Sequence, residues 1–264
     1  MVRVTFQKYE GLGNDFILVE LPRDEIAKGV VERLCDRHFG IGADGVLVVG
    51  PPSSSGADAT MTVLNADGSE PEMCGNGLRC VAVHLANKNG ARSLDLRIDT
   101  GAGPLACKVE DGDVEVDMGR LADLGPIDVA VGGRSHRFAR MSAGNPHAIT
   151  FSPYEPHEID AVGPQVATAA AFPEGTNVEF ARLHDDGAID LVVWERGVGR
   201  TLACGTGACA TVGAACLQGK RAFGEPIIVR LPGGNLRIAV EKGSLRTTMR
   251  GPARFVFRGE VTVP

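Results

Sequence analysis

Residues 73–77 read Met-Cys-Gly-Asn-Gly, and residues 203–207 read Ala-Cys-Gly-Thr-Gly. The two segments lie 130 positions apart, close to half of the 264-residue chain. In each, an apolar β-like run and a short loop come before the cysteine, and a helix-like stretch of small residues follows it. This repeat indicates that one α/β unit occurs twice in the chain.

Two further matches support the repeat. Residues 13–16 (Gly-Asn-Asp-Phe) correspond to residues 144–147 (Gly-Asn-Pro-His) at an offset of 131, and Asn65 corresponds to Glu195 at an offset of 130. Three separate matches at nearly one offset rarely arise by chance. They predict an α/β chain of the α+β type with two pseudo-symmetric halves that meet near residues 117–126.

Each half is expected to alternate β-like runs with two helices. The helices are predicted over 24–37, where Asp24 is the candidate N-cap, over 76–89, near 158–171 and over 205–219. The strands are predicted from runs that are rich in Val, Ile, Leu and Thr. These runs cover residues 2–7, 16–20, 45–49, 58–64, 94–98, 104–109, 113–118, 127–131, 134–141, 147–151, 177–183, 188–194, 226–231, 236–241, 245–250 and 253–258.

The composition restricts the class of partner. The net charge of −6 comes without a basic stripe, so nucleic acid and anionic membranes are poor candidate partners. The N-terminal sequence lacks the apolar run of a signal peptide, and no stretch reaches the roughly 18 apolar residues of a membrane span. We therefore expect a cytoplasmic protein that acts on a small molecule.

Seven cysteines, an odd number without a secretory signal, indicate reduced thiols. Free cysteines are usually small buried residues, which is what we expect for most of this set. The expectation applies to Cys35, Cys80, Cys107, Cys209 and Cys216. Only Cys74 and Cys204 recur in a shared context, so these two are predicted to carry chemistry.

Each of these two cysteines is predicted to lie where a strand gives way to a helix. The glycines that follow let backbone N–H groups approach a ligand closely. The first turn of a helix offers unpaired N–H donors and the positive end of the helix dipole. Such a position lowers the pKa of a thiol and binds an anion such as a substrate carboxylate.

A pseudo-two-fold axis would bring the two helix N-termini together across a cleft between the halves. A small amino acid there would have one cysteine on each side of its α-carbon. One thiolate would remove the α-proton and the opposite thiol would return a proton, which inverts the stereocentre without a cofactor. The pattern therefore predicts an amino-acid epimerase whose acid/base pair is Cys74 and Cys204.

Other polar residues are expected beside this cleft. His147 and Glu195 could accept a thiol proton or tune a cysteine, and Arg196 could pair with a carboxylate. A polar rim for a zwitterionic substrate is predicted from four asparagines at strand ends, although turn geometry alone also explains asparagine there. They are Asn14, Asn65, Asn145 and Asn177.

Six segments form a specific combination of motifs. They are KYEGLGNDF (8–16), GIGADG (40–45), LNADGSEPEMCGNGLRC (64–80), GNPHAI (144–149), GTNVEF (175–180) and ERGVGRTLACGTGACA (195–210). In residues, in order and in total length, this combination resembles the diaminopimelate epimerase family.

The resemblance implies two halves, 1–118 and 119–252, each a mainly antiparallel sheet curled around a central helix. The last strand, about 253–264, would return to the first half. The resemblance implies conversion of LL- to meso-diaminopimelate in lysine and peptidoglycan precursor synthesis, by a homodimer that uses neither pyridoxal phosphate nor a metal.

The resemblance also implies roles for individual residues. Cys74 and Cys204 match the acid/base pair, and His147 and Glu195 match the groups that modulate it. The implied substrate contacts are Asn14, Asn65, Gly75, Asn76, Asn145, Asn177, Glu195, Arg196, Gly205 and Thr206. Two positions depart from the family pattern, because Gly45 stands where some members have a glutamine and Arg200 where an acidic residue is common.

Several alternatives remain open at this point. The spacings C-x5-C and C-x4-C argue against a zinc site built from the four cysteines of the two helices. Gly40, Gly42 and Gly45 match a dinucleotide fingerprint, but a helix precedes them and a strand follows, which is the wrong order. Three competing functions remain. The chain could be another cofactor-independent amino-acid racemase, an isomerase of the wider fold without two-thiol chemistry, or a redox or zinc-binding protein.

Overall fold

The computed structural model describes residues 2–71 and 73–263. Its internal contacts divide the chain into two compact units. The first unit comprises Met1–Val116 together with Gly251–Pro264, and the second unit comprises Asp117–Arg250. Each unit has its own buried apolar core.

The first unit contains one sheet in the strand order β17-β1-β2-β3-β4-β5-β6-β7. Its strands are β1 (Val2–Gly11), β2 (Asn14–Val19), β3 (Gly45–Gly50), β4 (Ala59–Asn65), β5 (Ser93–Thr100), β6 (Gly103–Glu110), β7 (Asp113–Arg120) and β17 (Arg254–Val263). The pairs β2–β3 and β4–β5 are parallel and the other pairs are antiparallel. The hairpin β3–β4 closes through residues 51–58, which include the segment SSSG (53–56).

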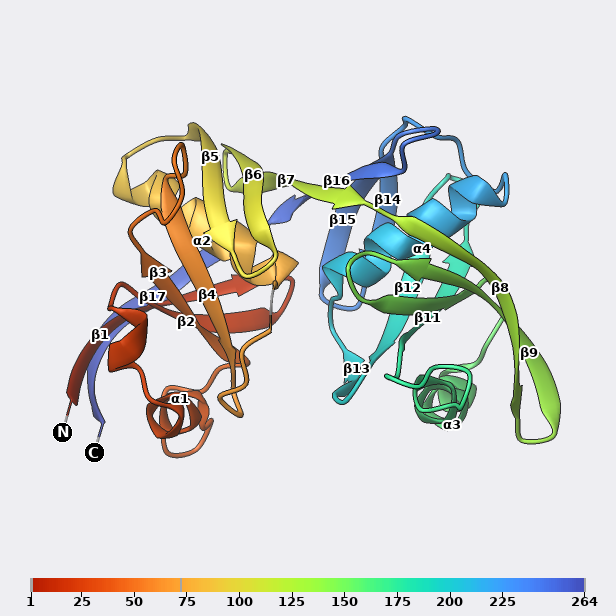
Figure 1. Ribbon diagram of the computed structural model, residues 1–264, viewed down its shortest axis with the longest axis horizontal. Coiled ribbons are helices and arrows are strands. Elements are labelled where there is room, and N and C mark those ends of the chain that lie inside the picture. The colour runs from red at the N-terminus through yellow and green to blue at the C-terminus, as the bar shows by residue number, and fades with distance from the viewer. Residues whose placement is uncertain (1, 72, 264) are drawn as a thin grey trace. The chain divides into compact units, whose positions relative to one another are not determined.

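The helix α2 (Gly75–Lys88) is the centre of the first unit. It contacts β1 to β6 and β17, so the sheet curls around it (Figure 1). Its residues from Gly75 to His84 are all buried. A helix that is covered on every side in this way must have small or apolar side chains over most of its surface.

The second unit repeats this arrangement with the strand order β8-β9-β10-β11-β12-β14-β15-β16. Its strands are β8 (Ala122–Val131), β9 (Arg134–Ser142), β10 (Pro146–Thr150), β11 (Asn177–Leu183), β12 (Ile189–Glu195), β14 (Ile227–Leu231), β15 (Gly234–Val240) and β16 (Arg246–Pro252), and the short β13 (Gly199–Thr201) pairs with β12. The parallel pairs, β10–β11 and β12–β14, stand at the same places in the order as those of the first unit.

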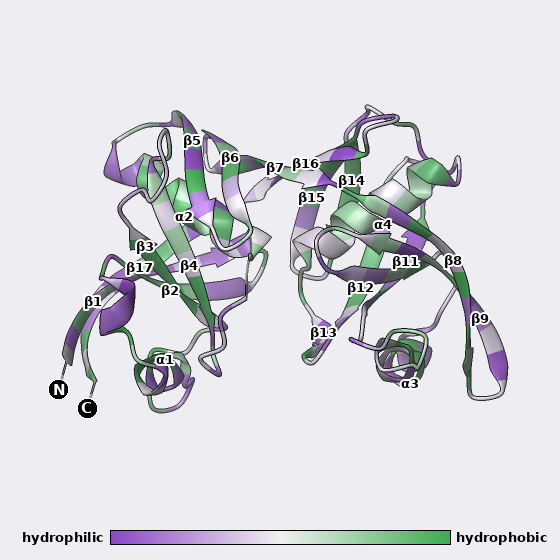
Figure 2. Ribbon diagram, in the orientation of Figure 1, coloured by the Kyte–Doolittle hydropathy of each residue, from purple (hydrophilic) through white to green (hydrophobic). Residues whose placement is uncertain are grey.

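The central helix of the second unit is α4 (Gly205–Leu217). Residues Gly207–Cys216 of this helix are buried, and Figure 2 draws α4 in white to green, the colours of neutral and apolar residues. The outer helix α3 (Pro156–Ala167) contacts β8, β11 and β12. The predicted fold class, with two repeated halves and mainly antiparallel curled sheets, is therefore confirmed.

The first predicted helix is wrong in its extent. The helix predicted over 24–37 is instead a short 3₁₀ turn, η1 (Arg23–Glu25), followed by α1 (Lys28–Cys35). Asp24 is not the N-cap of this helix, because Ala27 occupies that position without a side-chain hydrogen bond. Ile26 is buried in the core and has an extended backbone, so the helix cannot continue through this residue.

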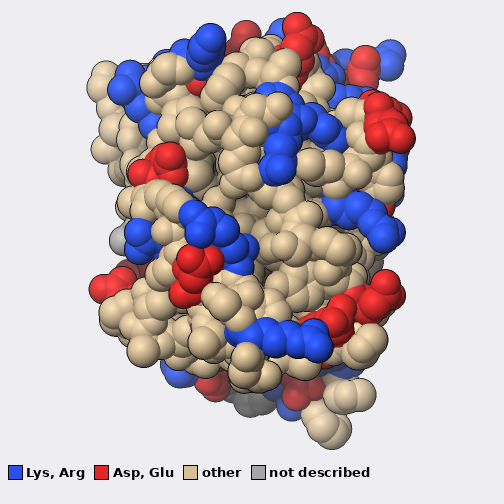
Figure 3. Space-filling view, turned by 90° about the vertical axis from the view of Figure 1, so that its right-hand side faces the viewer, with Lys and Arg blue, Asp and Glu red and all other residues tan. Residues whose placement is uncertain are grey.

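Among the residues that the structure describes, no helix is both long and apolar enough to cross a bilayer. Figure 3 shows basic and acidic side chains interspersed on one face, without a continuous surface of either sign.

Candidate active site

The two repeated cysteines are the N-cap residues of the two central helices. Cys74 precedes α2 with φ −139° and ψ 110°, and Cys204 precedes α4 with φ −125° and ψ 110°. The N–H of Gly77 lies 3.4 Å from the sulfur of Cys74, and the N–H of Gly207 lies 3.4 Å from the sulfur of Cys204. Each sulfur is therefore held by the first turn of a helix, in nearly the same local geometry, as the sequence predicts.

In the first unit, Asn14 and Asn76 accompany Cys74. The Cys74 sulfur lies 4.0 Å from Asn14 Oδ1, and the Asn76 side-chain amide donates to the same oxygen at 3.1 Å. The Asn14 amide nitrogen donates in turn to Asp44 Oδ2 at 2.6 Å. Asp44 therefore fixes Asn14 with its oxygen toward Cys74.

Arg79, one of the largest fully buried side chains, contacts Asn76 of this group. It donates to Asn76 Oδ1 at 3.0 Å and to the carbonyl oxygen of Pro252 at 3.2 Å. The sequence analysis did not identify Arg79 or Asp44 as site residues. An arginine between apolar residues in a helix that is expected to be buried is a signal that could have pointed to the first of them.

Local contacts explain the residues at two other positions that the sequence analysis singled out, Asn65 and Gly45. Asn65 ends β4 with an exposed side chain that donates to Ser69 Oγ at 2.9 Å, so it belongs to a turn. A Cβ atom at Gly45 would stand 2.6 Å from the carbonyl oxygen of Leu64. The close approach of β3 and β4 thus excludes a side chain at position 45 without a backbone shift.

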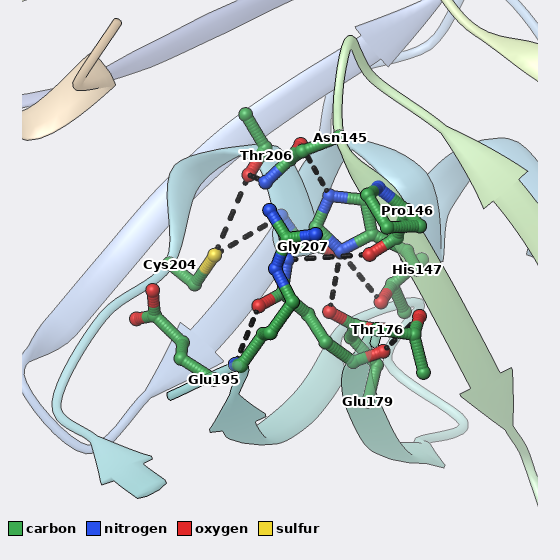
Figure 4. Close-up of polar contacts among 12 residues, drawn as sticks. Asn145, Pro146, His147, Thr176, Glu179, Glu195, Cys204, Thr206 and Gly207 are labelled. Atoms are coloured by element: carbon green, nitrogen blue, oxygen red, sulfur yellow. Dashed lines mark hydrogen bonds and ion pairs between the residues drawn. The ribbon is translucent and has the colours of Figure 1, made fainter. Parts of the chain in front are cut away.

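In the second unit, a chain of polar contacts leads away from Cys204 (Figure 4). The Cys204 sulfur lies 3.5 Å from Thr206 Oγ1, and the Asn145 amide nitrogen donates to that oxygen at 3.4 Å. Asn145 Oδ1 lies 2.9 Å from His147 Nε2. The structure therefore brings these four predicted residues together: Cys204, Thr206, Asn145 and His147.

The chain of contacts ends at Glu179, which the sequence analysis missed. Glu179 Oε1 lies 2.7 Å from His147 Nδ1, and the side chains of both residues are completely buried. Burial raises the pKa of the Glu179 carboxyl, while the neighbouring His147 acts in the opposite direction. An acidic residue in an apolar strand was the available signal, since the first five residues of β11 are all buried.

The pKa of Cys204 differs from the sequence-based expectation. Burial raises the pKa of the Cys204 thiol well above its usual value, and the carboxyls of Glu195 and Glu179 raise it further. Hydrogen bonds from Thr206 and Gly207 lower the pKa, but they do not offset burial. The expected depression by the helix N-terminus is therefore wrong for this cysteine in the structure described here.

Glu195 is partly buried near the cysteine. Burial raises the pKa of its carboxyl, and the nearby Glu179 contributes in the same direction. The hydroxyl of Thr201 donates to Glu195 Oε1 at 2.5 Å and acts in the opposite direction. The Glu195 carboxyl in turn raises the pKa of the Cys204 thiol, which is the kind of effect expected of a modulating residue.

Asn177 and Arg196 have structural partners. Asn177 Oδ1 accepts from the backbone N–H of Arg196 at 2.9 Å, and its amide donates to the carbonyl oxygen of Pro146 at 3.3 Å. The guanidinium of Arg196 donates to the carbonyl oxygen of Glu174 at 2.8 Å. These bonds tie the end of β12 to the loop before β11.

The remaining predicted positions are also located. Arg200 lies on β13 and pairs with Asp160 of α3 at 3.3 Å. The five other cysteines are buried, as predicted. Within residues 2–71 and 73–263, no group of three or more His, Cys, Asp or Glu residues has an arrangement that could hold a metal.

Comparison with known proteins identifies relatives over nearly the whole chain. The family model described as "Diaminopimelate epimerase" matches residues 6–122 and 139–256. A protein from Synechocystis sp. named diaminopimelate epimerase is 42% identical over 280 residues, with 98% of this chain and 99% of the relative covered.

Solved structures show the same fold at low sequence identity. A hydroxyproline epimerase from Agrobacterium vitis has a TM-score of 0.77 at 17% identity, covering 98% of this chain and 92% of that chain. A phenazine biosynthesis protein of the PhzF family from Bacillus anthracis has a TM-score of 0.75 at 16% identity, with both chains fully covered.

Proposed function

Because the chain belongs to the diaminopimelate epimerase family and is therefore an isomerase, we propose that it converts LL-2,6-diaminopimelate to the meso isomer. The observation that carries this proposal is the repeated N-cap cysteine, with each sulfur held 3.4 Å from a glycine N–H in the first helical turn. The product would serve lysine and peptidoglycan precursor synthesis.

We propose that Cys74 and Cys204 act on opposite faces of one α-carbon. One sulfur, as thiolate, removes the α-proton, and the electron pair of the broken C–H bond moves toward the carboxylate. The opposite thiol then delivers its proton to the other face, which leaves the two cysteines with their roles exchanged. A step of this kind requires acid and base to be present at once.

The charge that develops on the substrate carboxylate needs hydrogen-bond donors. The proposed donors are the backbone N–H groups of the two helix starts, which include Gly75, Asn76, Gly205 and Thr206. Donors fixed by a helix need no reorganisation during the reaction, which makes them effective in stabilising the carbanion-like transition state.

The polar side chains around the sulfurs complete the proposal. His147 and Glu195 would tune Cys204, since Glu195 raises the pKa of that thiol and His147 reaches it through Asn145 and Thr206. The other proposed substrate contacts are Asn14, Asn65, Asn145, Asn177 and Arg196. The homodimer implied by the family resemblance and the cytoplasmic location expected from the sequence stay predictions.

Incubation in deuterium oxide without added cofactor tests the proposed reaction. We expect LL-diaminopimelate to gain deuterium at one α-carbon as the meso isomer forms. Glutamate, aspartate, lysine and proline should keep their α-hydrogens under the same conditions. Exchange on one of these amino acids, with none on diaminopimelate, would establish another racemase of this fold. Bound zinc or an obligatory disulfide in a protein without exchange would favour the redox or zinc-binding alternative.

A further inference from the structure

Glu179 occupies a position where a charge is costly. It lies on β11, next to the parallel strand β10, which carries His147. Its side chain is completely buried, and Glu179 Oε2 has no hydrogen-bond partner among residues 2–71 and 73–263. The titratable groups that face it are His147 from β10, Glu195 from β12 and Cys204 before α4. Of these, only His147 can supply a positive charge.

The burial of the pair determines how many protons it holds. An ionised Glu179 beside a neutral imidazole would leave an uncompensated negative charge in a dry site, next to a second carboxyl. A pair that is neutral as a whole and shares one proton across the 2.7 Å contact avoids this cost. A hydrogen on Glu179 Oε2 would have no acceptor among residues 2–71 and 73–263. In the neutral pair the shared proton therefore lies either on His147, as imidazolium beside carboxylate, or on Glu179 Oε1.

Both forms put a hydrogen on His147 Nε2. In the imidazolium form both ring nitrogens are protonated. In the other form the acid donates from Oε1 to Nδ1, so the neutral ring must carry its hydrogen on Nε2. In either form Nε2 donates to Asn145 Oδ1, which lies 2.9 Å away.

The direction of this bond determines the direction of the next two. With its oxygen engaged by His147, Asn145 presents its amide hydrogens to Thr206 Oγ1 at 3.4 Å. The Thr206 oxygen then acts as an acceptor, and its own hydrogen can point to the Cys204 sulfur at 3.5 Å. Together with the Gly207 N–H, this gives the sulfur two hydrogen-bond donors.

We propose that Glu179 is a positioning residue of this site: acting through His147, it fixes the direction of the hydrogen-bond chain Asn145–Thr206–Cys204 so that the sulfur is the acceptor. Without the carboxyl group, a neutral His147 is free to carry its hydrogen on Nδ1. The Asn145 amide then turns over, Thr206 donates to Asn145, and Cys204 must donate its own hydrogen to Thr206. The role in turnover rests on the proposed function, whereas the direction of the chain does not.

Nitrogen NMR of the full-length protein labelled with ¹⁵N-histidine tests the direction without a substrate. The His147→Gln variant assigns the signals. We expect His147 Nε2 to carry a hydrogen in the parent protein at neutral pH. In Glu179→Gln, part of the population should have Nε2 without a hydrogen. A parent protein in which His147 Nε2 carries no hydrogen would overturn the proposal, whatever the stability of Glu179→Gln.

A double-mutant cycle with Thr206→Val tests the role in turnover, because this variant interrupts the chain between Glu179 and Cys204. We expect Glu179→Gln to lower kcat by about 10- to 100-fold, as for other residues that orient a reacting group, with a much smaller change in KM. In the Thr206→Val background the same substitution should have almost no further effect on kcat. An equal loss in both backgrounds would mean a merely structural role and would overturn the proposal.

The parent protein separates this proposal from the proposed function. If the parent fails to epimerise diaminopimelate, the proposed function is wrong, and the nitrogen NMR result alone then decides the direction of the chain.

Discussion

Cys74 and Cys204 have nearly the same backbone geometry, but the asparagines beside them have different hydrogen-bond partners. In the first unit Asn14 donates to Asp44 and turns its oxygen toward Cys74. In the second unit Asn145 turns its oxygen toward His147 and its amide hydrogens toward Thr206, beside Cys204. The repeated sequence thus reproduces the geometry around the sulfur but presents opposite hydrogen-bonding groups.

The two anchors also differ in their exposure to water. The Asp44 side chain is 41% exposed and shares a salt bridge with Arg37, whereas Glu179 is fully buried. Electrostatic interactions are weaker where water screens them. A duplicated unit can therefore repeat one backbone geometry around two sulfurs and still give each sulfur a different electrostatic environment. Such a difference suits the proposed reaction, which needs an acid and a base.

The largest effect is expected from removal of either sulfur. Cys74→Ala and Cys204→Ala should each lower kcat for epimerisation by about 10²- to 10⁴-fold or more, because each removes one of the two proposed proton carriers. Steady-state kinetics with a circular dichroism check of the fold measures this.

Two buried cysteines one turn or more further along the same helices provide the matched controls. Cys80→Ala and Cys209→Ala remove a sulfur from each central helix outside the site and should keep the parent activity. Full turnover by Cys74→Ala or Cys204→Ala would reject the assignment of two proton carriers and leave the comparison of the two units without a functional meaning.

A smaller effect is expected at the glycines that donate to the sulfurs. A Cβ atom at Gly207 would stand 2.8 Å from Glu179 Oε1, and a Cβ atom at Gly77 would stand 2.8 Å from a methyl group of Leu47. Glu179 is held by His147, whereas a leucine methyl can rotate away. Gly207→Ala should therefore destabilise the protein by about 1–3 kcal/mol and lower kcat more than Gly77→Ala does.

Chemical denaturation and kinetics of both alanine variants measure this difference. Equal losses of stability and of kcat in the two variants would contradict the idea that the second unit depends on a fixed buried pair and the first does not.

The smallest effect is expected from Glu195→Gln. The Glu195 carboxyl raises the pKa of the Cys204 thiol, so removing its charge should lower that pKa. More thiolate is then present at a given pH between 8 and 10, and alkylation of Cys204 should become faster. Peptide mass spectrometry after timed exposure to iodoacetamide measures the rate.

Asp160→Asn is the control for this measurement, because it removes an exposed carboxylate of the same unit that pairs with Arg200. It should leave the alkylation profile of Cys204 in place. A profile that moves to higher pH in Glu195→Gln would contradict the electrostatic role of Glu195.

The sequence predicts those features of the site that depend on local order. The repeat at one offset predicts two units of one topology, and the glycines after Cys74 and Cys204 predict both helix starts. The predicted strand boundaries also lie close to the observed ones, as for β11 (Asn177–Leu183), because apolar runs and turn residues define them locally.

The missed features depend on contacts between distant segments. Glu179 matters because β10 and β11 pair in parallel through a connection that contains α3, and no local pattern reveals that register. The start of α1 depends on Ile26, which is buried among residues of β1, β2 and β3. The pKa of Cys204 depends on the balance of burial and two nearby carboxyls against two hydrogen bonds, which only the packed structure reveals.

The return of β17 (Arg254–Val263) to β1 makes the first unit discontinuous in sequence, whereas the second unit is continuous. At a synthesis rate of about 5–20 residues per second, roughly 7–30 s separate Val116 from the end of β17 on the ribosome. The second unit, although it is encoded later, is thus the first to have its whole chain synthesised. A nascent chain that stalls before Arg254 would leave β1 as an open sheet edge, the kind of edge that recruits other chains into aggregates.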